Sequence, residues 1–123
     1  MPAHVGPIDP SRPVDIEIAG LSNHAIAFAL WWRAPDRADW TLLGQGHTGD
    51  GAAGLPKLSL TATPHAQIYY WVAASNPARP HAAYHARLRL TQNAILLPNG
   101  EIGLRGTTDA VGNDSVEEWI DLL

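Results

Sequence analysis

Apolar and polar positions alternate over much of this chain. Residues 14–20 read VDIEIAG and residues 84–91 read YHARLRLT, so that every second side chain is apolar or small in both segments. This is the period of a β-strand with one face buried and the other in water. Residues 57–63, KLSLTAT, alternate in the same way, whereas residues 67–75, QIYYWVAAS, are aromatic and β-branched on both faces. We expect a strand at each segment, with 67–75 at the centre of a sheet.

A pair of adjacent tryptophans ends another apolar run, HAIAFALWWRA at residues 24–34. Neighbouring side chains of a strand point to opposite faces, so Trp31 and Trp32 cannot enter the same core. Trp32 continues the face of Phe28 and is predicted in the core. Trp31 continues a face of alanines, against which the same chain, a second copy or a ligand would pack closely. The alanines also suit a helix, which stays the alternative for this segment.

Two hairpins are predicted from turn residues. Residues 34–39, APDRAD, form a turn, after which residues 40–48, WTLLGQGHT, return as a strand. Farther along, Asn99 and Gly100 have the composition of a two-residue type I′ turn between apolar residues. That turn predicts cross-strand pairs of Leu97 with Ile102 and of Ile95 with Leu104. A type I turn with a bulge at Gly100 is the alternative and would shift this register.

Short strands separated by Gly, Pro, Asn and Asp turns, with no long helix, indicate an all-β fold. We expect a single antiparallel β-sandwich of about seven to nine strands over residues 14–123, of jelly-roll or immunoglobulin-like type. Residues 115–123, SVEEWIDLL, form its last strand, with a short helix as the alternative. Residues 1–13 carry four prolines and are expected to form an extended or poorly ordered arm.

Composition limits the classes of function. The chain has 123 residues, 46% of them hydrophobic and 16% charged, which suits one globular domain. The net charge of -4 gives no broad positive field, so we expect neither nucleic-acid nor membrane binding. No signal peptide or long apolar run is visible, and a cytoplasmic location is expected. The absence of cysteine excludes disulfides and thiolate chemistry. Many alanines and a single lysine, Lys57, are typical of a high-GC bacterial genome.

Several motifs carry chemistry elsewhere but lack their context here. Residues 44–49, GQGHTG, match the dinucleotide-binding pattern, yet no helix-forming segment follows and residues 62–70 contain no acidic residue. We expect a strand-connecting loop there. The histidines of residues 81–85, HAAYH, lie about 13 Å apart on a strand, too far to share a zinc ion. No catalytic triad, carboxylate pair or nucleophile elbow is evident as a pattern, so an enzyme is not expected.

Calcium is the one cofactor that the sequence suggests, as a weak alternative to having none. Asp109, Asn113 and Asp114 lie in a glycine-containing loop, and hard oxygen ligands on a turn suit this ion. The spacing is not that of an EF-hand. Because the same residue types are the ordinary chemistry of turns, a hydrogen-bonded connection between two strands is the stronger interpretation.

A basic stripe is predicted on the wet face of residues 84–91. His85, Arg87 and Arg89 alternate there, and such a stripe suits a carboxylate, a phosphate or an acidic patch on another protein. The ordinary role of these charges is to keep an exposed strand soluble. The acidic side chains of residues 117–121 have the opposite charge and would pair with the stripe within one subunit or between two.

The aromatic surplus favours a non-catalytic module that works through an interaction surface. One face of each strand fills the core of a small sandwich, yet Trp31, Tyr69, Trp71 and Trp119 fall on the opposite faces. Exposed aromatic clusters are typical of protein interfaces and of sugar-stacking platforms. We expect self-association as a homo-oligomer, or the binding of a protein or carbohydrate partner.

The alternative is a small-ligand-binding β-barrel or a small enzyme. Its interior pocket would be lined by Tyr69, Trp71, Tyr84 and the histidines.

Overall fold

The structure, a computed structural model, describes residues 3–47 and 57–123. Within these ranges the chain forms nine β-strands and no helix, and so no helix that could cross a membrane. The strands are β1 (Ala3–Val5), β2 (Val14–Gly20), β3 (Ala25–Arg33), β4 (Thr41–His47), β5 (Leu58–Leu60), β6 (Gln67–Ser75), β7 (Ala83–Gln92), β8 (Ile95–Thr107) and β9 (Asn113–Leu122). The all-β prediction is confirmed.

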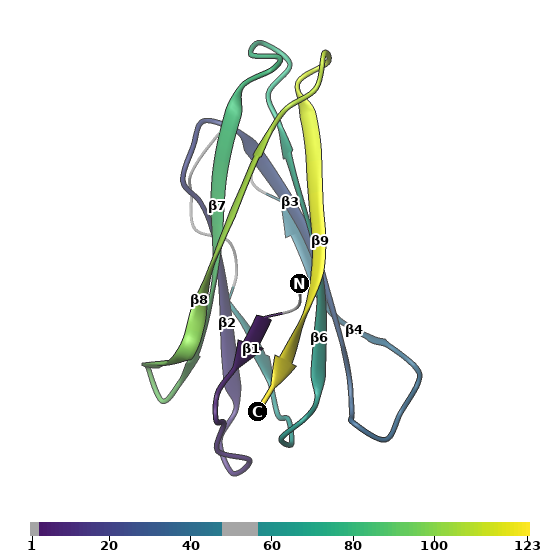
Figure 1. The fold of residues 1–123 in the computed structure, drawn as a ribbon, viewed down its shortest axis with the longest axis vertical. Coiled ribbons are helices and arrows are strands. Elements are labelled where there is room, and N and C mark those ends of the chain that lie inside the picture. Colours follow the sequence, from purple (N-terminus) through teal and green to yellow (C-terminus); the bar gives the residue numbers. More distant parts are fainter. Residues whose placement is uncertain (1–2, 48–56) are drawn as a thin grey trace.

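The strands form two sheets that pack face to face as a β-sandwich. One sheet has five strands in the order β1-β9-β6-β3-β4, and the other has four in the order β5-β2-β7-β8. Neighbouring strands are antiparallel, except that β1 runs parallel to β9. Figure 1 shows the two layers side by side, with β2, β7 and β8 to the left of β6 and β9. Strand β6, predicted to be central, is the middle strand of the larger sheet.

The core lies between the sheets and is filled by the apolar set of each alternating segment. Ile16 of β2, Leu88 of β7 and Ile120 of β9 are each 0% exposed. Residues 24–34 and 115–123 form strands rather than the alternative helices. Trp32 is partly buried and packs against this core, as predicted from its position on the Phe28 face.

The hairpin predicted at Asn99 and Gly100 is wrong. Strands β7 and β8 are joined instead by Asn93 and Ala94, whose φ angles of 52° and 63° are those of a type I′ turn. Gly100 lies inside β8, where an added Cβ would stand 2.6 Å from the carbonyl oxygen of Leu90. A close approach of the β7 backbone, at a register shift between the two strands, therefore requires this glycine.

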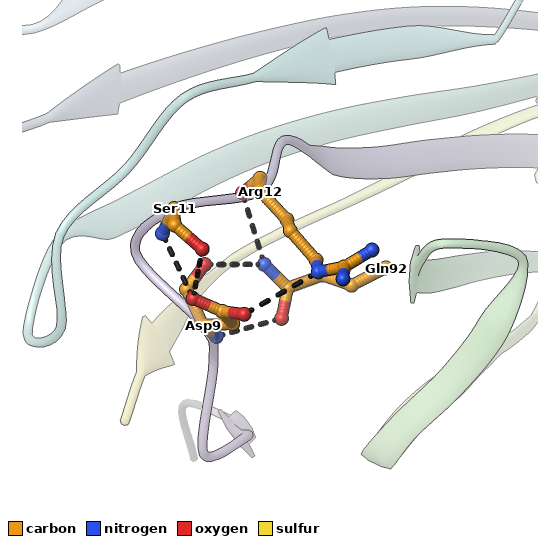
Figure 2. Close-up of polar contacts among 4 residues, drawn as sticks. All are labelled: Asp9, Ser11, Arg12 and Gln92. Carbon is orange, nitrogen blue, oxygen red and sulfur yellow. Dashed lines mark hydrogen bonds and ion pairs between the residues drawn. The ribbon is translucent and has the colours of Figure 1, made fainter.

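The N-terminal arm is tied to both sheets. Strand β1 pairs with the end of β9, and its Val5 is 0% exposed. Beyond β1, the side chain of Gln92 holds the arm (Figure 2): its Nε2 donates to the carbonyl oxygens of Asp9 at 2.8 Å and Arg12 at 3.0 Å. Its Oε1 accepts the Asp9 N–H at 2.8 Å. The sequence places the first strand at Val14, because the prolines conceal a three-residue strand before it.

Candidate functional site

The outer face of the five-stranded sheet gathers the predicted aromatic residues. The pairing of β3, β6 and β9 places Trp31 opposite Tyr69, and Tyr69 opposite Trp119. Trp71 follows Tyr69 by two positions on β6 and therefore lies on the same face. Trp40, which precedes β4, contacts the ring of Tyr69. We call this surface the aromatic face, made of Trp31, Trp40, Tyr69, Trp71 and Trp119.

Part of the aromatic face is a shallow apolar pocket. The ring centroids of Trp31 and Tyr69 are 5.7 Å apart with the planes at 55°, and those of Trp40 and Tyr69 are 5.8 Å apart at 57°. Tilted rings at this separation are a favourable aromatic arrangement. Together the three rings line a pocket of about 280 Å³. The sequence reasoning missed Trp40 because it lies outside the alternating strands, although its place beside a predicted turn was the available signal.

A row of polar side chains crosses the sheet next to this pocket. Arg33 Nε donates to Gln67 Oε1 at 2.7 Å, and Gln67 Nε2 donates to Asp121 Oδ1 at 2.6 Å. The other oxygen of Asp121 lies 3.5 Å from His4 Nδ1 of β1. The guanidinium carbon of Arg33 stands 4.3 Å from the centroid of a Trp40 ring, a cation–π distance. We call this set the polar row, and it holds Trp40 over the sheet.

Tyr69 is fixed at both ends. Its ring lies between Trp31 and Trp40, and its hydroxyl donates to Glu117 Oε2 at 2.6 Å. That hydrogen bond is the main reason why the pKa of Tyr69 is raised above its ordinary value. The centre of the aromatic face is therefore preorganised.

A second depression lies beside the first, over the small residues of β3. Ala29 stands between Gln45 of β4 and Trp71 of β6, and Ala27 is opposite His47 of β4. These residues help to line a depression of about 460 Å³, which we call the alanine trough. The depression lies over the alanine face against which the sequence predicts close packing, and the packing itself stays a prediction. Among the residues that the structure describes, the side chains of Gln45 and His47 have no hydrogen-bond partner.

The basic stripe lies on the other side of the sandwich. His85, Arg87 and Arg89 belong to β7 and point out of the four-stranded sheet. The predicted interface residues therefore divide between two opposite surfaces. Arg87 and Arg89 lie 3.7 Å from the carboxylate of Glu101 on β8 and not beside the acidic residues 117–121, so the predicted pairing within one subunit is wrong.

The candidate calcium ligands accept hydrogen bonds from other groups of the same chain. The Asp109 carboxylate accepts the backbone N–H groups of Asn113 at 2.9 Å and Val111 at 3.0 Å, which holds the pKa of Asp109 below its ordinary value. Asn113 Oδ1 accepts the hydroxyl of Ser75, and Asp114 Oδ2 accepts that of Tyr84. This is the hydrogen-bonded strand connection that the sequence favoured over an ion site.

The remaining candidates do not converge on a site. Residues 44–47 belong to β4, so the connecting loop expected for the GQGHTG segment is wrong over these residues, and the end of the segment lies outside the described residues. Tyr84 is buried in the core, whereas Tyr69 and Trp71 lie on an outer face, so the three cannot line one interior pocket. In ranges 3–47 and 57–123 no three His, Asp or Glu side chains are grouped to hold a metal ion.

Comparisons with protein-family models, with curated proteins and with solved structures find no match to this chain.

Proposed function

We propose that this chain is a non-catalytic carbohydrate-binding module whose ligand lies on the aromatic face. The observation that carries the proposal is the row of Trp31, Tyr69 and Trp119 across three neighbouring strands, with the polar row on one side and the alanine trough on the other. Large rings and planar polar side chains are thus interleaved on one rigid sheet.

This combination matches the surface of a sugar chain. A pyranose ring has an apolar C–H face, which packs on an aromatic ring, and a rim of hydroxyl groups, which needs donors and acceptors. Trp31 and Trp71 supply rings, and the side chains of Gln45 and His47 line the same depression as Trp71. The carboxylates of Glu117 and Asp121 add acceptors at the far side of the sheet.

The dimensions favour an oligosaccharide over a single sugar. Ala27 and Trp31 are four positions apart on β3, which is about 13 Å along the strand. The four strands β4, β3, β6 and β9 span about 14 Å across. A chain that reached from the pocket to the trough would contact Trp31 with one sugar unit and Trp71 with another.

The acidic groups of this face support binding rather than hydrolysis. A glycosidase needs two carboxyl groups on either side of one bond, about 5–9.5 Å apart. Glu117 and Asp121 are four positions apart on β9, about 13 Å along the strand. Each also accepts a hydrogen bond within the sheet, from Tyr69 and Gln67 respectively.

Self-association through the same face is the second candidate. Leu42, opposite Trp31 on β4, is 48% exposed, and Trp40 and Trp119 are 38% and 41% exposed. Large apolar side chains at this exposure are typical of subunit interfaces. The carbohydrate is preferred because a second copy of this face would bring Glu117 and Asp121 into contact with apolar rings.

Binding and association are tested together. Tryptophan fluorescence is followed with cellohexaose, xylohexaose, mannohexaose, chitohexaose and laminarihexaose, and light scattering after size-exclusion chromatography gives the mass. We expect a monomer that binds at least one hexasaccharide saturably, and we expect the affinity to fall at least tenfold in Trp31→Ala and Trp71→Ala. Ile95→Ala, which removes a 69% exposed residue of β8, is the control and keeps full affinity.

Two outcomes contradict the proposal. A dimer that dissociates in Trp31→Ala, with no saccharide bound, would establish self-association instead. A monomer that binds no member of the panel would remove both candidates.

A further inference from the structure

The outer face of the four-stranded sheet has a gap at Gly103 of β8. Gly103 lies opposite Arg87 of β7, and Arg105, the next residue on the same face of β8, lies opposite His85. The atom nearest to a Cβ added at Gly103 would be His85 Nε2, at 3.8 Å. His85 therefore borders a position that no side chain of β8 fills, and the register places Arg87 and Arg105 next to it. We call His85, Arg87 and Arg105 the basic cluster.

Arg89, which the sequence grouped with this stripe, is balanced by carboxylates. It stands between Glu17 of β2 and Glu101 of β8 in one cross-strand row. Glu101 Oε1 lies 3.7 Å from Arg89 Nε and 3.7 Å from Arg87 Nη1. Arg105 has no ion-pair partner in the part of the chain that the structure describes. The excess positive charge is thus at the His85 end of the stripe and not at the Arg89 end.

The cluster also holds a donor without an acceptor. Arg87 Nε is shielded from solvent, although its side chain is 38% exposed, and no described residue accepts its hydrogen bond; the same holds for Arg89 Nε, outside the cluster. A shielded N–H group without a partner is unfavourable, so the Arg87 side chain would gain a hydrogen bond by turning toward a bound anion. Guanidinium groups donate in a planar fork that fits the oxygens of phosphate and sulfate.

We propose that the basic cluster binds a tetrahedral oxyanion, phosphate or sulfate, either free or as the ester group of a larger molecule. The register places basic residues of both β7 and β8 around Gly103, an arrangement that suits several oxygens around one centre better than the two oxygens of a carboxylate. Arg105, together with Arg87 in competition with Glu101, offsets the negative charge of such a group. The cluster is on the opposite side of the sandwich from the aromatic face, so this proposal does not depend on carbohydrate binding.

The test follows arginine side-chain Nε–H and backbone N–H signals by NMR at constant ionic strength, set with sodium chloride. The titrants are inorganic phosphate, sulfate, glucose 6-phosphate and acetate. We expect saturable shifts at Arg87, Gly103 and Arg105 with phosphate and sulfate, and weaker shifts with acetate. Tighter binding of glucose 6-phosphate than of inorganic phosphate would identify an ester as the ligand, and the reverse order would identify the free anion.

Variants distinguish binding of the anion at the basic cluster from a general effect of the net charge of the protein. Arg87→Ala and Arg105→Ala each weaken phosphate binding about tenfold or more, because each removes a charged donor. Arg37→Ala makes the same change in net charge in an exposed turn and leaves the affinity unchanged. Glu101→Gln removes the carboxylate that competes for Arg87 and tightens binding severalfold.

The proposal fails if the phosphate shifts rise linearly without saturation. It also fails if Arg37→Ala weakens binding as much as Arg87→Ala does.

Discussion

Replacing Gln92 by leucine removes the contacts that hold the N-terminal arm against β7. The side chain makes three hydrogen bonds to the backbone of Asp9 and Arg12, and Gln92 itself is only 7% exposed. A hydrogen bond contributes about 0.5–1.5 kcal/mol net. Water can hydrogen-bond to the backbone of Asp9 after the substitution, which offsets part of the loss. For the three hydrogen bonds together we therefore expect a loss of unfolding free energy of about 2–3 kcal/mol, in the lower part of their combined range. For a domain of this size such a loss lowers Tm by about 10 °C.

Urea unfolding followed by tryptophan fluorescence measures this loss, and hydrogen exchange localises it. The amide of Asp9 is expected to lose its protection from exchange in Gln92→Leu. Core amides of β6 are expected to exchange only through global unfolding, as they do in the unsubstituted chain. Gln45→Leu is the matched control, because its side chain has no hydrogen bond among the described residues, and it changes stability by about 0.5 kcal/mol or less. A loss below 1 kcal/mol in Gln92→Leu, with Asp9 still protected, would refute the anchoring role.

Two further predictions concern turns. Ala94→Gly stabilises the chain by about 0.5–1 kcal/mol, because Ala94 has a φ of 63° that glycine adopts without strain; a lower urea midpoint would contradict the turn assignment. Asp109 has a lowered pKa because the backbone N–H groups of Asn113 and Val111 bond its carboxylate, so its contribution to stability is present above the ordinary pKa of 3.8 and is lost as pH falls through the lower folded value. Asp109→Asn therefore reduces the slope of stability against pH below about pH 4, and unchanged slopes in acid titrations would exclude this linkage.

The strands were predictable where one face meets the core and the other meets water. Residues 14–20 and 84–91 follow this rule, and the structure has β2 and β7 there. The hairpin prediction at Asn99 and Gly100 failed because the same residue pair suits either a tight turn or a close contact between backbones. Only the tertiary structure decides between these two. The true turn, Asn93 and Ala94, lacks the glycine that type I′ turns prefer.

The sequence predicted most of the aromatic residues of the candidate site, but it did not predict the residues that surround them. Alternation alone assigns Trp31, Tyr69 and Trp71 to outer faces, and it does not tell which sheet each face belongs to. The pairing of β6 with both β3 and β9 brings these side chains together, and that pairing joins residues about forty or more positions apart. Trp40 and Arg105 were also missed because their neighbours, Tyr69 and His85, are distant in the sequence.

The most direct test of the account follows the indole Nε1–H signals of the tryptophans by NMR, with the hexasaccharide that quenches fluorescence most. The account predicts saturable shifts for Trp31 and Trp71, with one dissociation constant, and no shift for Trp32 on the core side of the same sheet. Binding that shifts Trp32 and leaves Trp31 and Trp71 unchanged, or no saturable shift with any of the hexasaccharides, would contradict it.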